Sequence, residues 1–330
     1  MRMLVIGLGS MGKRRIRNLK TLGVLNIGGV DPREDRREES ASKFAVPTFS
    51  SVEEAVAAFA PSALIISTPP DRHMEYAFFG YRHGLPCFIE ASVVDAGKIL
   101  ELHDLTHDGG PIMAPSCTMR YFPGPAKVKE LICAGTIGKV LNVNYHTGQY
   151  LKDWHPWEPI ESYYVSNRLT GGCREIVPFE LTWLNDVFGE PEPLACLRAC
   201  VGDMSVDIDD IYHFWLRYPG DTLANITVEV LSRPEVTREM RVLGTMGQVV
   251  FSANENVVRV RTLGSDAWTR FELQRGRAED GYINPEEPYV GELRDFLQAV
   301  ETNNPAAFPN TLLDDYGVLQ TLCALERLAV

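Results

Sequence analysis

The sequence predicts an α/β protein of two domains, with a doubly wound parallel sheet over residues 1–118 and an α+β domain with a large, mostly antiparallel open sheet over residues 119–330. Three observations predict this fold. A glycine-rich turn follows an apolar run at the N-terminus, strand-like and helix-like segments then alternate to about residue 118, and a series of strand-like segments follows. A chain of 330 residues is also long for a single hydrophobic core.

The glycine-rich turn has the spacing G-x-G-x-x-G, at Gly7, Gly9 and Gly12, directly after the apolar run from Met3 to Ile6. In a strand–turn–helix unit, Gly7 permits the turn, Gly9 lets a pyrophosphate approach the backbone, and Gly12 lets the helix pack on the strand. The spacing therefore predicts a dinucleotide site, with a plain strand–turn–helix connection as the alternative.

The helix after this turn begins near Ser10 and Met11, and its apolar pattern ends at Gly23. The first N–H groups of a helix have no acceptor within the helix, and the helix dipole places a partial positive charge there. We therefore expect Ser10 and Met11 to lie against the phosphates of the dinucleotide.

Asp31 follows a second apolar run, from Val24 to Val30, nineteen residues after the last glycine of the turn. A carboxylate at this place accepts hydrogen bonds from the adenosine ribose, and its charge would repel a 2′-phosphate. The cofactor expected is therefore NAD rather than NADP. Arg33 or Arg36 is close enough in sequence to Asp31 to reach the adenine or a 2′-phosphate.

The rest of the first domain alternates regularly between the two kinds of pattern. Helices are expected over 34–44, from 51, over 71–83 and over 95–106; strands are expected over 46–49, 63–68, 86–91 and 112–115. In the second domain the expected strands are 140–150, 194–201, 211–218, 223–231, 239–243, 249–252, 257–262 and 269–273, with helices over 125–134, 290–301 and 312–328.

The bulk properties exclude several classes of partner. A formal net charge of −12 argues against nucleic acid and against an anionic membrane surface, and no stretch of 18 apolar residues is present. Seven cysteines without a CxxC pair, and a chain that opens directly into a strand, indicate reduced thiols in the cytoplasm. His103 and His107 have helical spacing but are expected on the surface, so no metal site is predicted.

Four further motifs give the chain a family resemblance. They are Ser67-Thr68-Pro69-Pro70-Asp71-Arg72-His73, Met119-Arg120-Tyr121-Phe122, Ile137-Gly138-Lys139-Val140 and Leu169-Thr170-Gly171-Gly172, the last followed by a helix to Phe188. With the glycine turn, this order of parts resembles the glucose–fructose oxidoreductase / inositol dehydrogenase (Gfo/Idh/MocA) family over nearly the whole chain. The segment Asp153-Trp154-His155-Pro156-Trp157-Glu158 resembles members from bacterial surface-glycan gene clusters.

The resemblance implies a Rossmann domain followed by an α/β domain whose sheet forms a homo-dimer or homo-tetramer contact. It also implies NAD(H) or NADP(H) as cofactor and a sugar, cyclitol or nucleotide-sugar as substrate. By the same resemblance, the nicotinamide end of the cofactor would lie near a group of residues from the first domain. These are Ser67, Thr68, Pro69, His73 and Glu90.

The chain departs from the family at its catalytic positions. The family's E-K-P motif appears as Glu90-Ala91-Ser92, so that Ala91 replaces the lysine. The family's Asp and His on the active-site helix correspond to Ile176 and Phe179. None of these three side chains can move a proton, so the proton carrier must come from elsewhere.

Two stretches offer substitutes. The first is the loop after residue 148, where His155 has an unperturbed pKa near neutrality and Lys152 can act as an acid when desolvated. Trp154 and Trp157 offer flat faces for a sugar ring. The alternative is a purely structural loop, pinned by tryptophan packing.

The second stretch carries two carboxylates, Glu175 and Glu180, either of which can serve as acid/base if burial raises its pKa. The alternative is that Glu180 pairs with Arg174 or Arg120 and only holds the helix. Pro178 indicates the first position of a helix or a kink. The substrate contacts expected overall are Arg120, Lys152, Trp154, Trp157, Tyr163, Arg168 and Arg174.

The sequence therefore predicts an NAD(P)-dependent oxidoreductase that transfers hydride between a sugar derivative and nicotinamide. Two other classes stay open. One is a dinucleotide-binding sensor or partner protein without dehydrogenase activity, suggested by the three lost catalytic side chains. The other is a lyase or epimerase that keeps its NAD bound and regenerates it in each cycle.

Overall fold

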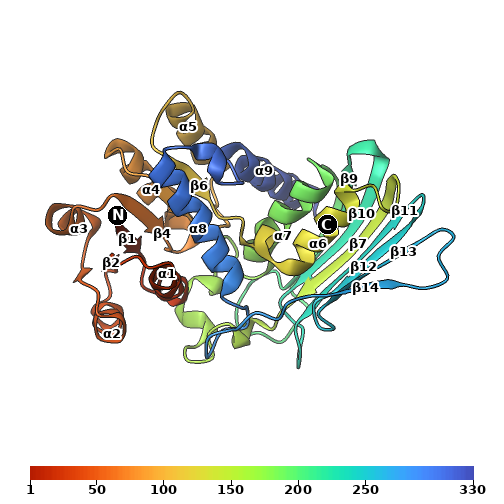
Figure 1. The fold of residues 1–330 in the computed structure, drawn as a ribbon. Coiled ribbons are helices and arrows are strands. Elements are labelled where there is room, and N and C mark those ends of the chain that lie inside the picture. The colour runs from red at the N-terminus through yellow and green to blue at the C-terminus, as the bar shows by residue number, and fades with distance from the viewer. The chain divides into compact units, whose positions relative to one another are not determined.

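The computed structural model describes residues 1–330, which form two compact units. The first unit contains Met1–Thr118 and Glu286–Tyr316, and the second contains Met119–Pro285 and Gly317–Val330 (Figure 1). The change of unit after residue 118 coincides with the change of sequence pattern. Residues 286–316, which the sequence pattern groups with the second domain, lie in the first unit.

The first unit is built on a six-stranded parallel sheet of order β3-β2-β1-β4-β5-β6. The strands are β1 (Arg2–Ile6), β2 (Asn26–Val30), β3 (Thr48–Phe49), β4 (Ala63–Ile66), β5 (Cys87–Ile89) and β6 (Met113–Pro115). All four residues of β4 are buried, as expected of a parallel strand covered on both faces. The strand order reverses between β1 and β4, and ligands of doubly wound sheets bind at the carboxyl ends of the strands at such a point.

Six helices belong to this unit: α1 (Ser10–Thr21), α2 (Glu34–Phe44), α3 (Val52–Phe59), α4 (His73–Arg82), α5 (Ala96–Thr106) and α8 (Glu287–Thr302). Side chains begin two of them as expected of N-caps. Ser51 accepts a hydrogen bond from Glu54 N at the start of α3, and Asp95 accepts one from Lys98 N at the start of α5. Helix α8 packs on the sheet through Phe296, whose ring lies 5.8 Å from that of Phe88.

The second unit is built on an eight-stranded sheet of order β14-β13-β12-β11-β7-β10-β9-β8. Only the β7–β10 pair is parallel, so the sheet is mostly antiparallel, as predicted. The strands are β7 (Val140–Gly148), β8 (Glu192–Ala199), β9 (Ile211–Tyr218), β10 (Thr222–Glu229), β11 (Thr237–Gly244), β12 (Gly247–Ser252), β13 (Val257–Thr262) and β14 (Thr269–Glu272).

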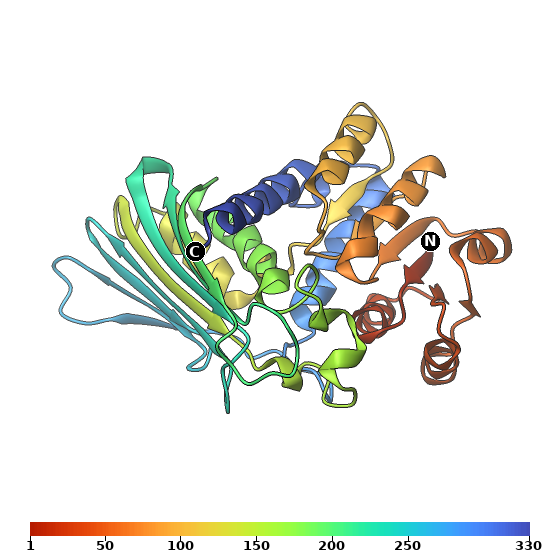
Figure 2. The ribbon, with the colours of Figure 1, turned by 180° about the vertical axis from the view of Figure 1, so that it is seen from behind.

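Helices cover one face of this sheet. Helix α6 (Pro123–Cys133) contacts β12 and β13, and α7 (Cys173–Phe188) contacts β9 and β10. Figure 2 shows both helices on the same side, with no helix over the opposite face. Residues of β9 and β11 alternate between buried and exposed, which fits one covered and one open face.

Helix α9 (Leu312–Leu328) ends the fold, and seven short 3₁₀ turns connect the larger elements. These are η1 (Pro70–Arg72), η2 (Thr118–Tyr121), η3 (Leu151–Asp153), η4 (Ile160–Ser162), η5 (Tyr164–Ser166), η6 (Pro219–Asp221) and η7 (Pro305–Ala307). No helix combines the length and the apolar character needed to cross a bilayer. All seven cysteines are free thiols.

Pro178 lies inside α7 and not at its first position. The helix begins at Cys173, after Gly172 with φ of 59°, and so includes the proline in its second turn. Proline removes one backbone donor there and costs about 3 kcal/mol in an isolated helix. The fully buried neighbours Val177 and Leu181 hold the helix against the core through this gap.

Candidate functional site

Two of the three glycines in the N-terminal turn are required by the fold itself. Gly7 has φ of 91°, and a Cβ atom there would lie 2.5 Å from Ser67 O. A Cβ on Gly12 would lie 1.7 Å from Gly7 O, so α1 could not approach β1. These contacts give physical reasons for the first and third glycines of the spacing.

Gly9 differs, because the protein alone does not require a glycine there. It caps α1 with an ordinary φ of −70°, and a Cβ atom on it would meet Arg36 Nη1 first, at 3.4 Å. The missing side chain leaves the backbone at the start of α1, with Ser10 and Met11 in its first turn, open to approach. Such a helix N-terminus fits the pyrophosphate of a dinucleotide.

Asp31 braces the glycine turn from the end of β2. Its Oδ2 accepts a 2.8 Å hydrogen bond from Leu8 N, its Oδ1 accepts one of 2.9 Å from Arg33 N, and the residue is 3% exposed. Arg36 Nη1 lies 3.8 Å from Oδ2. The Arg33 side chain points away, to the carboxylate of Asp35 at 2.5 Å. That Asp31 accepts a hydrogen bond from an adenosine ribose hydroxyl stays a prediction.

The segment after β4 holds buried polar atoms without protein partners. His73 Nε2 bonds Thr68 O at 2.8 Å, while His73 Nδ1 and Thr68 Oγ1 are buried with no hydrogen-bond partner. Burial lowers the pKa of His73, so its imidazole is neutral near pH 7. Buried groups of this kind cost free energy unless a ligand or water satisfies them, which fits a binding site beside Ser67 and Pro69.

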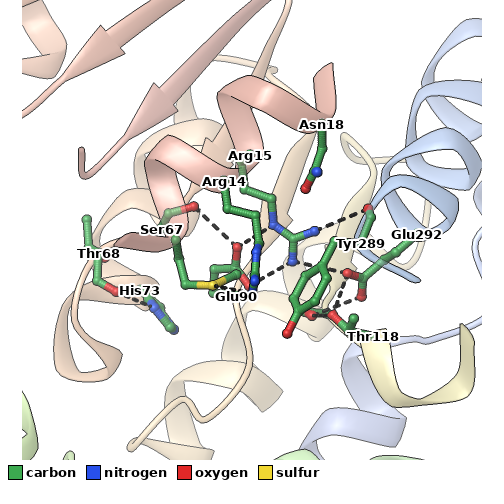
Figure 3. A network of polar contacts seen from close by, with 12 residues as sticks. Arg14, Arg15, Asn18, Ser67, Thr68, His73, Glu90, Thr118, Tyr289 and Glu292 are labelled. Atoms are coloured by element: carbon green, nitrogen blue, oxygen red, sulfur yellow. Dashed lines mark hydrogen bonds and ion pairs between the residues drawn. The ribbon is translucent and has the colours of Figure 1, made fainter. Parts of the chain in front are cut away.

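Glu90 is held by a buried arginine from α1 (Figure 3). Arg15 Nε and Nη2 donate to the two oxygens of Glu90 at 2.6 and 2.9 Å, and Ser67 Oγ donates to Oε1 at 3.3 Å. The guanidinium is wholly buried and also lies 4.4 Å from the centre of the Phe88 ring. Arg15 therefore fixes Glu90 but cannot itself touch a substrate.

A second carboxylate, Glu292 of α8, shares the same guanidinium at 3.1 Å. It also accepts hydrogen bonds from Ser116 Oγ at 2.9 Å, Cys117 N at 2.5 Å and Thr118 Oγ1 at 2.7 Å (Figure 3). Burial raises the pKa of Glu292, and Arg15 opposes this shift. Burial alone would lower the pKa of Arg15. The negative charges of Glu90 and Glu292 outweigh this effect, so the pKa of the guanidinium is raised. The sequence did not predict a role for Arg15 or Glu292, because charged residues on helices are normally exposed.

In the second unit, the loop between β7 and α7 is anchored by its apolar residues. Leu151, Ile160 and Val165, one from each of three 3₁₀ turns, are at most 4% exposed. A Cβ on Gly171 would lie 2.1 Å from Val165 O, so this glycine lets the loop close onto the start of α7. The loop is therefore a packed structure that carries polar side chains.

Within this loop, His155 is stacked between two aromatic rings. Its ring centre lies 5.0 Å from that of Trp157 and 4.6 Å from that of Tyr163, with interplanar angles near 20°. Its Nδ1 lies 2.9 Å from Glu158 Oε1. The Tyr163 hydroxyl is buried without a hydrogen-bond partner. Burial raises the pKa of Tyr163, and Glu175 and Glu158 raise it further.

Glu175 lies in the first turn of α7, where Tyr164 donates a 2.8 Å hydrogen bond to its Oε1. Burial raises the pKa of Glu175 from 4.5 to about 8, against the lowering effect of the Tyr164 hydroxyl. The rings of Tyr163 and Tyr164 meet edge to face at 5.8 Å. His155, Tyr163, Tyr164 and Glu175 thus form one contiguous group, here called the loop–α7 cluster.

Glu180 has a different environment, in which every oxygen is satisfied. Tyr145 and Trp183 Nε1 donate to its Oε2 at 2.6 and 2.9 Å, and Arg238 Nη2 donates to Oε1 at 2.5 Å. The residue is fully buried. Its ionic partner is Arg238 and not Arg174 or Arg120, because β11 lies beside β7 and directs Arg238 to the helix-covered face.

The other residues expected at a substrate have varied surroundings. Arg174 binds Glu326 Oε1 at 2.7 Å, Arg120 binds Thr182 O at 3.2 Å, and Arg168 binds Asp207 and Asp209 at 2.5 Å each. Lys152 is exposed. Trp154 Nε1 is buried without a hydrogen-bond partner. Of the expected set, Trp157 and Tyr163 flank the candidate acid/base groups most directly.

Two family models match the chain. One, described as "Oxidoreductase family, NAD-binding Rossmann fold", matches residues 1–102. The other, described as "GFO/IDH/MocA C-terminal domain", matches residues 126–250. Among curated proteins, trans-1,2-dihydrobenzene-1,2-diol dehydrogenase of Mus musculus is 23% identical over 207 residues, a match that spans 60% of this chain and 58% of the mouse enzyme.

Solved structures share the fold along almost the entire chain. An oxidoreductase from Agrobacterium radiobacter, solved with NAD⁺, L-tartaric acid and magnesium, has a TM-score of 0.85 at 11% identity, covering 99% of this chain and 95% of its own. Levoglucosan dehydrogenase with NADH and levoglucosan has a TM-score of 0.83 at 16% identity, covering 99% and 96%.

The UDP-N-acetylglucosamine 3-dehydrogenase of Acidithiobacillus ferrooxidans has a TM-score of 0.78 at 19% identity, covering 100% of this chain and 97% of its own. At such identities these structures show the shared fold, and the family models show the membership. The chain belongs to the Gfo/Idh/MocA family of oxidoreductases and carries the family's NAD-binding Rossmann domain at its N-terminus.

Proposed function

We propose that the protein is an NAD-dependent oxidoreductase that oxidises a hydroxyl group of a sugar or nucleotide-sugar, or reduces the corresponding ketone. The family membership and the glycine turn support the cofactor. The names of two structural relatives, a levoglucosan dehydrogenase and a UDP-N-acetylglucosamine 3-dehydrogenase, support the substrate class. NAD, when bound, supplies the hydride acceptor.

The observation that carries the proposal is the place of Glu175 in the loop–α7 cluster, where Tyr164 donates to its Oε1 at 2.8 Å and burial raises the pKa of its carboxyl group to about 8. A group that titrates near the working pH is the most effective proton carrier, because both of its forms are populated. In the direction of oxidation the carboxylate takes the proton of the substrate hydroxyl; in the direction of reduction the carboxylic acid returns it. Glu180 is a weaker candidate, because Arg238 and Tyr145 already bind both of its oxygens.

His155 is the second candidate for this role. Its stacking between Trp157 and Tyr163 restricts the ring, and Glu158 orients Nδ1. An imidazole oriented in this way can also exchange a proton with a substrate. We therefore assign proton transfer to Glu175 and a positioning role beside the sugar to His155. Single variants of the two residues test this assignment.

The test is a screen for NADH formation from NAD with UDP-N-acetylglucosamine, UDP-glucose, levoglucosan, myo-inositol and glucose. Turnover of one of these sugars is expected, and Glu175→Gln should reduce kcat more than His155→Asn does. A Gly9→Val protein, which should not bind the dinucleotide, controls for contaminating dehydrogenases. If His155→Asn reduced kcat more than Glu175→Gln does, the proton-transfer role would belong to His155.

A second function has an observation in its favour. Ala91, Ile176 and Phe179 stand where the family carries its Lys, Asp and His, which fits a dinucleotide-binding sensor without turnover. Tight NADH binding, together with no NADH formation from any sugar of the screen, would favour the sensor. NADH formation from any of these sugars would exclude the sensor function. An absorbance band of nicotinamide in the purified protein would instead indicate a tightly held cofactor.

We further propose that the protein is a homo-dimer or homo-tetramer assembled through the open face of the eight-stranded sheet. Exposed apolar side chains on β8, β9 and β10 of this face include Leu197 at 45%, Trp215 at 58% and Leu223 at 47%. Sedimentation of Trp215→Asp is expected to show dissociation, while Leu25→Asp, at an exposed leucine of the first unit, is not. Unchanged sedimentation of Trp215→Asp would contradict this assembly.

A further inference from the structure

The end of helix α5 carries two histidines and an aspartate close together on its surface. The backbone N–H of His107 donates to His103 O at 2.9 Å, so the two residues keep helical geometry. Their rings are nearly parallel, with centres 5.3 Å apart and an interplanar angle of 22°. Asp104, three residues before His107, is also its neighbour on the helix surface. One potential ligand atom from each of the three residues lies within 4.8 Å of the others.

The imidazole of His107 has the tautomer and the orientation of a metal ligand. Its Nδ1 lies 3.0 Å from the backbone oxygen of Asp104, and because a carbonyl oxygen can only accept, Nδ1 carries the proton. The neutral ring therefore presents the lone pair of Nε2 to the outside. Histidines that bind metals commonly donate their second N–H to a backbone carbonyl in this way, which fixes the ring.

A fourth side chain, Asp108, lies beside this nitrogen. Its Oδ2 is 3.3 Å from His107 Nε2. Two ligands of a tetrahedral zinc ion, each about 2.1 Å from the metal, are roughly 3.4 Å apart. Asp108 and His107 therefore already have the spacing of two ligands of one ion. His103 is only half-buried and Asp104 is exposed, so both can turn toward the same ion without repacking the core.

The charges around this group favour a cation. Helix α5 ends at Thr106, and the last carbonyl groups of a helix carry a partial negative charge. Asp104 and Asp108 add two carboxylates at the same end. The single lysine of the helix, Lys98, pairs with Asp95 at the opposite end, so no basic side chain of α5 neutralises the two carboxylates.

We propose that His103, Asp104, His107 and Asp108, here called the α5 cluster, bind a divalent transition-metal ion, with zinc as the best fit. Imidazole and carboxylate ligands together suit zinc, whereas calcium and magnesium prefer oxygen ligands alone. The histidine spacing did not predict this site, because it does not show that the two carboxylates lie beside the rings.

The α5 cluster is separate from the proposed dinucleotide site in the same unit. Helix α5 leads into the amino end of β6, whereas the glycine turn follows the carboxyl end of β1. Both strands belong to one parallel sheet, so the two sites lie at opposite edges of it. A bound ion would join the end of α5 to Asp108 beyond it and stabilise this connection, a role that adds to the proposed function.

The test is a calorimetric titration of zinc chloride into the full-length protein, without an affinity tag and after treatment with a chelator. Saturable binding of one zinc ion per chain is expected. His103→Asn and His107→Asn should each raise the Kd at least tenfold, because each variant removes one imidazole ligand. The proposal is wrong if zinc gives no saturable heat, or if both variants bind zinc as the unchanged protein does.

The matched control is His83→Asn at the end of α4. His83 is also exposed, and its Nδ1 lies 2.9 Å from the backbone oxygen of Phe79, but it is outside the α5 cluster. This variant should leave the Kd unchanged, and an effect as large as that of His107→Asn would contradict the proposal. Cys133→Ser combined with Cys200→Ser removes the two exposed thiols and should also leave the Kd unchanged. Loss of zinc binding in that protein would assign the ion to the thiols instead.

Discussion

The hydroxyl of Tyr164 donates a 2.8 Å hydrogen bond to Oε1 of Glu175, in a setting where burial raises the pKa of that carboxyl to about 8. The tyrosine favours the ionised carboxylate and burial favours the acid, so the two effects together leave the group titratable near neutral pH. Five residues later on the same helix, Glu180 is bonded to Arg238 and serves the packing of α7 on the sheet. One helix therefore carries two carboxylates with different roles.

Gly9→Ala and Gly12→Ala are expected to separate binding from folding. The Cβ of Gly9→Ala meets only Arg36 at 3.4 Å, so unfolding in urea should change by about 0.5 kcal/mol or less, while the Kd for NADH rises at least tenfold. The Cβ of Gly12→Ala would lie 1.7 Å from Gly7 O, so that variant should lose about 3 kcal/mol or fail to fold. Equal effects of both variants on stability would contradict this reading of the turn.

Asp31→Asn should change the choice between the two dinucleotides. The amide oxygen of asparagine can still accept from Leu8 N, but the negative charge that repels a 2′-phosphate is lost. Fluorescence titrations are expected to show weaker NADH binding and a higher NADH-to-NADPH ratio of Kd values. Glu53→Gln, at an exposed carboxylate in the first turn of α3, is the control and should leave the ratio unchanged.

Arg15→Met removes the cation that Glu90 and Glu292 share. The fully buried carboxylate of Glu292 and the partly exposed carboxylate of Glu90 then lack their counter-ion, which should cost about 3 kcal/mol at pH 7. Because burial already raises the pKa of Glu292, the folded variant retains a proton that the unfolded chain loses, and the variant becomes more stable as pH falls. Urea unfolding at pH 8 and pH 6 measures this. Arg15→Met combined with Glu292→Gln should recover part of the loss, and no recovery would contradict the shared-cation account.

Glu175→Gln should change how stability depends on pH. The folded carboxyl has a pKa of about 8 and its ordinary value is 4.5, so between these values the folded state holds a proton that the unfolded chain has released. The contribution of this carboxyl group to the stability of the wild type is therefore fully present below pH 4.5 and falls by up to about 1.4 kcal/mol per pH unit as the pH rises toward 8. Glu175→Gln should lose this slope. Glu180→Gln, which leaves Arg238 buried without its carboxylate, should instead be destabilised by about 3 kcal/mol or more.

Local patterns predicted local structure well. The glycine spacing predicted the turn after β1, because Gly7 and Gly12 are required by contacts within the strand–turn–helix unit. The apolar and alternating patterns predicted both sheets for the same reason, since each strand shows its covered faces in its own residues. Sequence reasoning also found the loop and helix that carry the loop–α7 cluster.

Long-range pairings could not be read in this way. The amphipathic pattern of α8 does not say which sheet the helix covers, so its place in the first unit was missed. Arg15 and Glu292 are 277 residues apart, and Arg238 and Glu180 are 58 apart. Only the fold brings them together. The raised pKa of Glu175 likewise depends on its burial in the folded chain, which residue spacing does not reveal.

The measurement that tests the central proposal most directly is the pH dependence of kcat for sugar oxidation, with the most active sugar of the screen. The wild type should gain about tenfold per pH unit below pH 8 and level off above it, because the carboxylate form of Glu175 takes the proton. Glu175→Gln should lower kcat by about 10²–10⁴-fold and remove this rise while NADH binding is retained. A Glu175→Gln protein with the kcat and pH profile of the wild type would contradict the assignment.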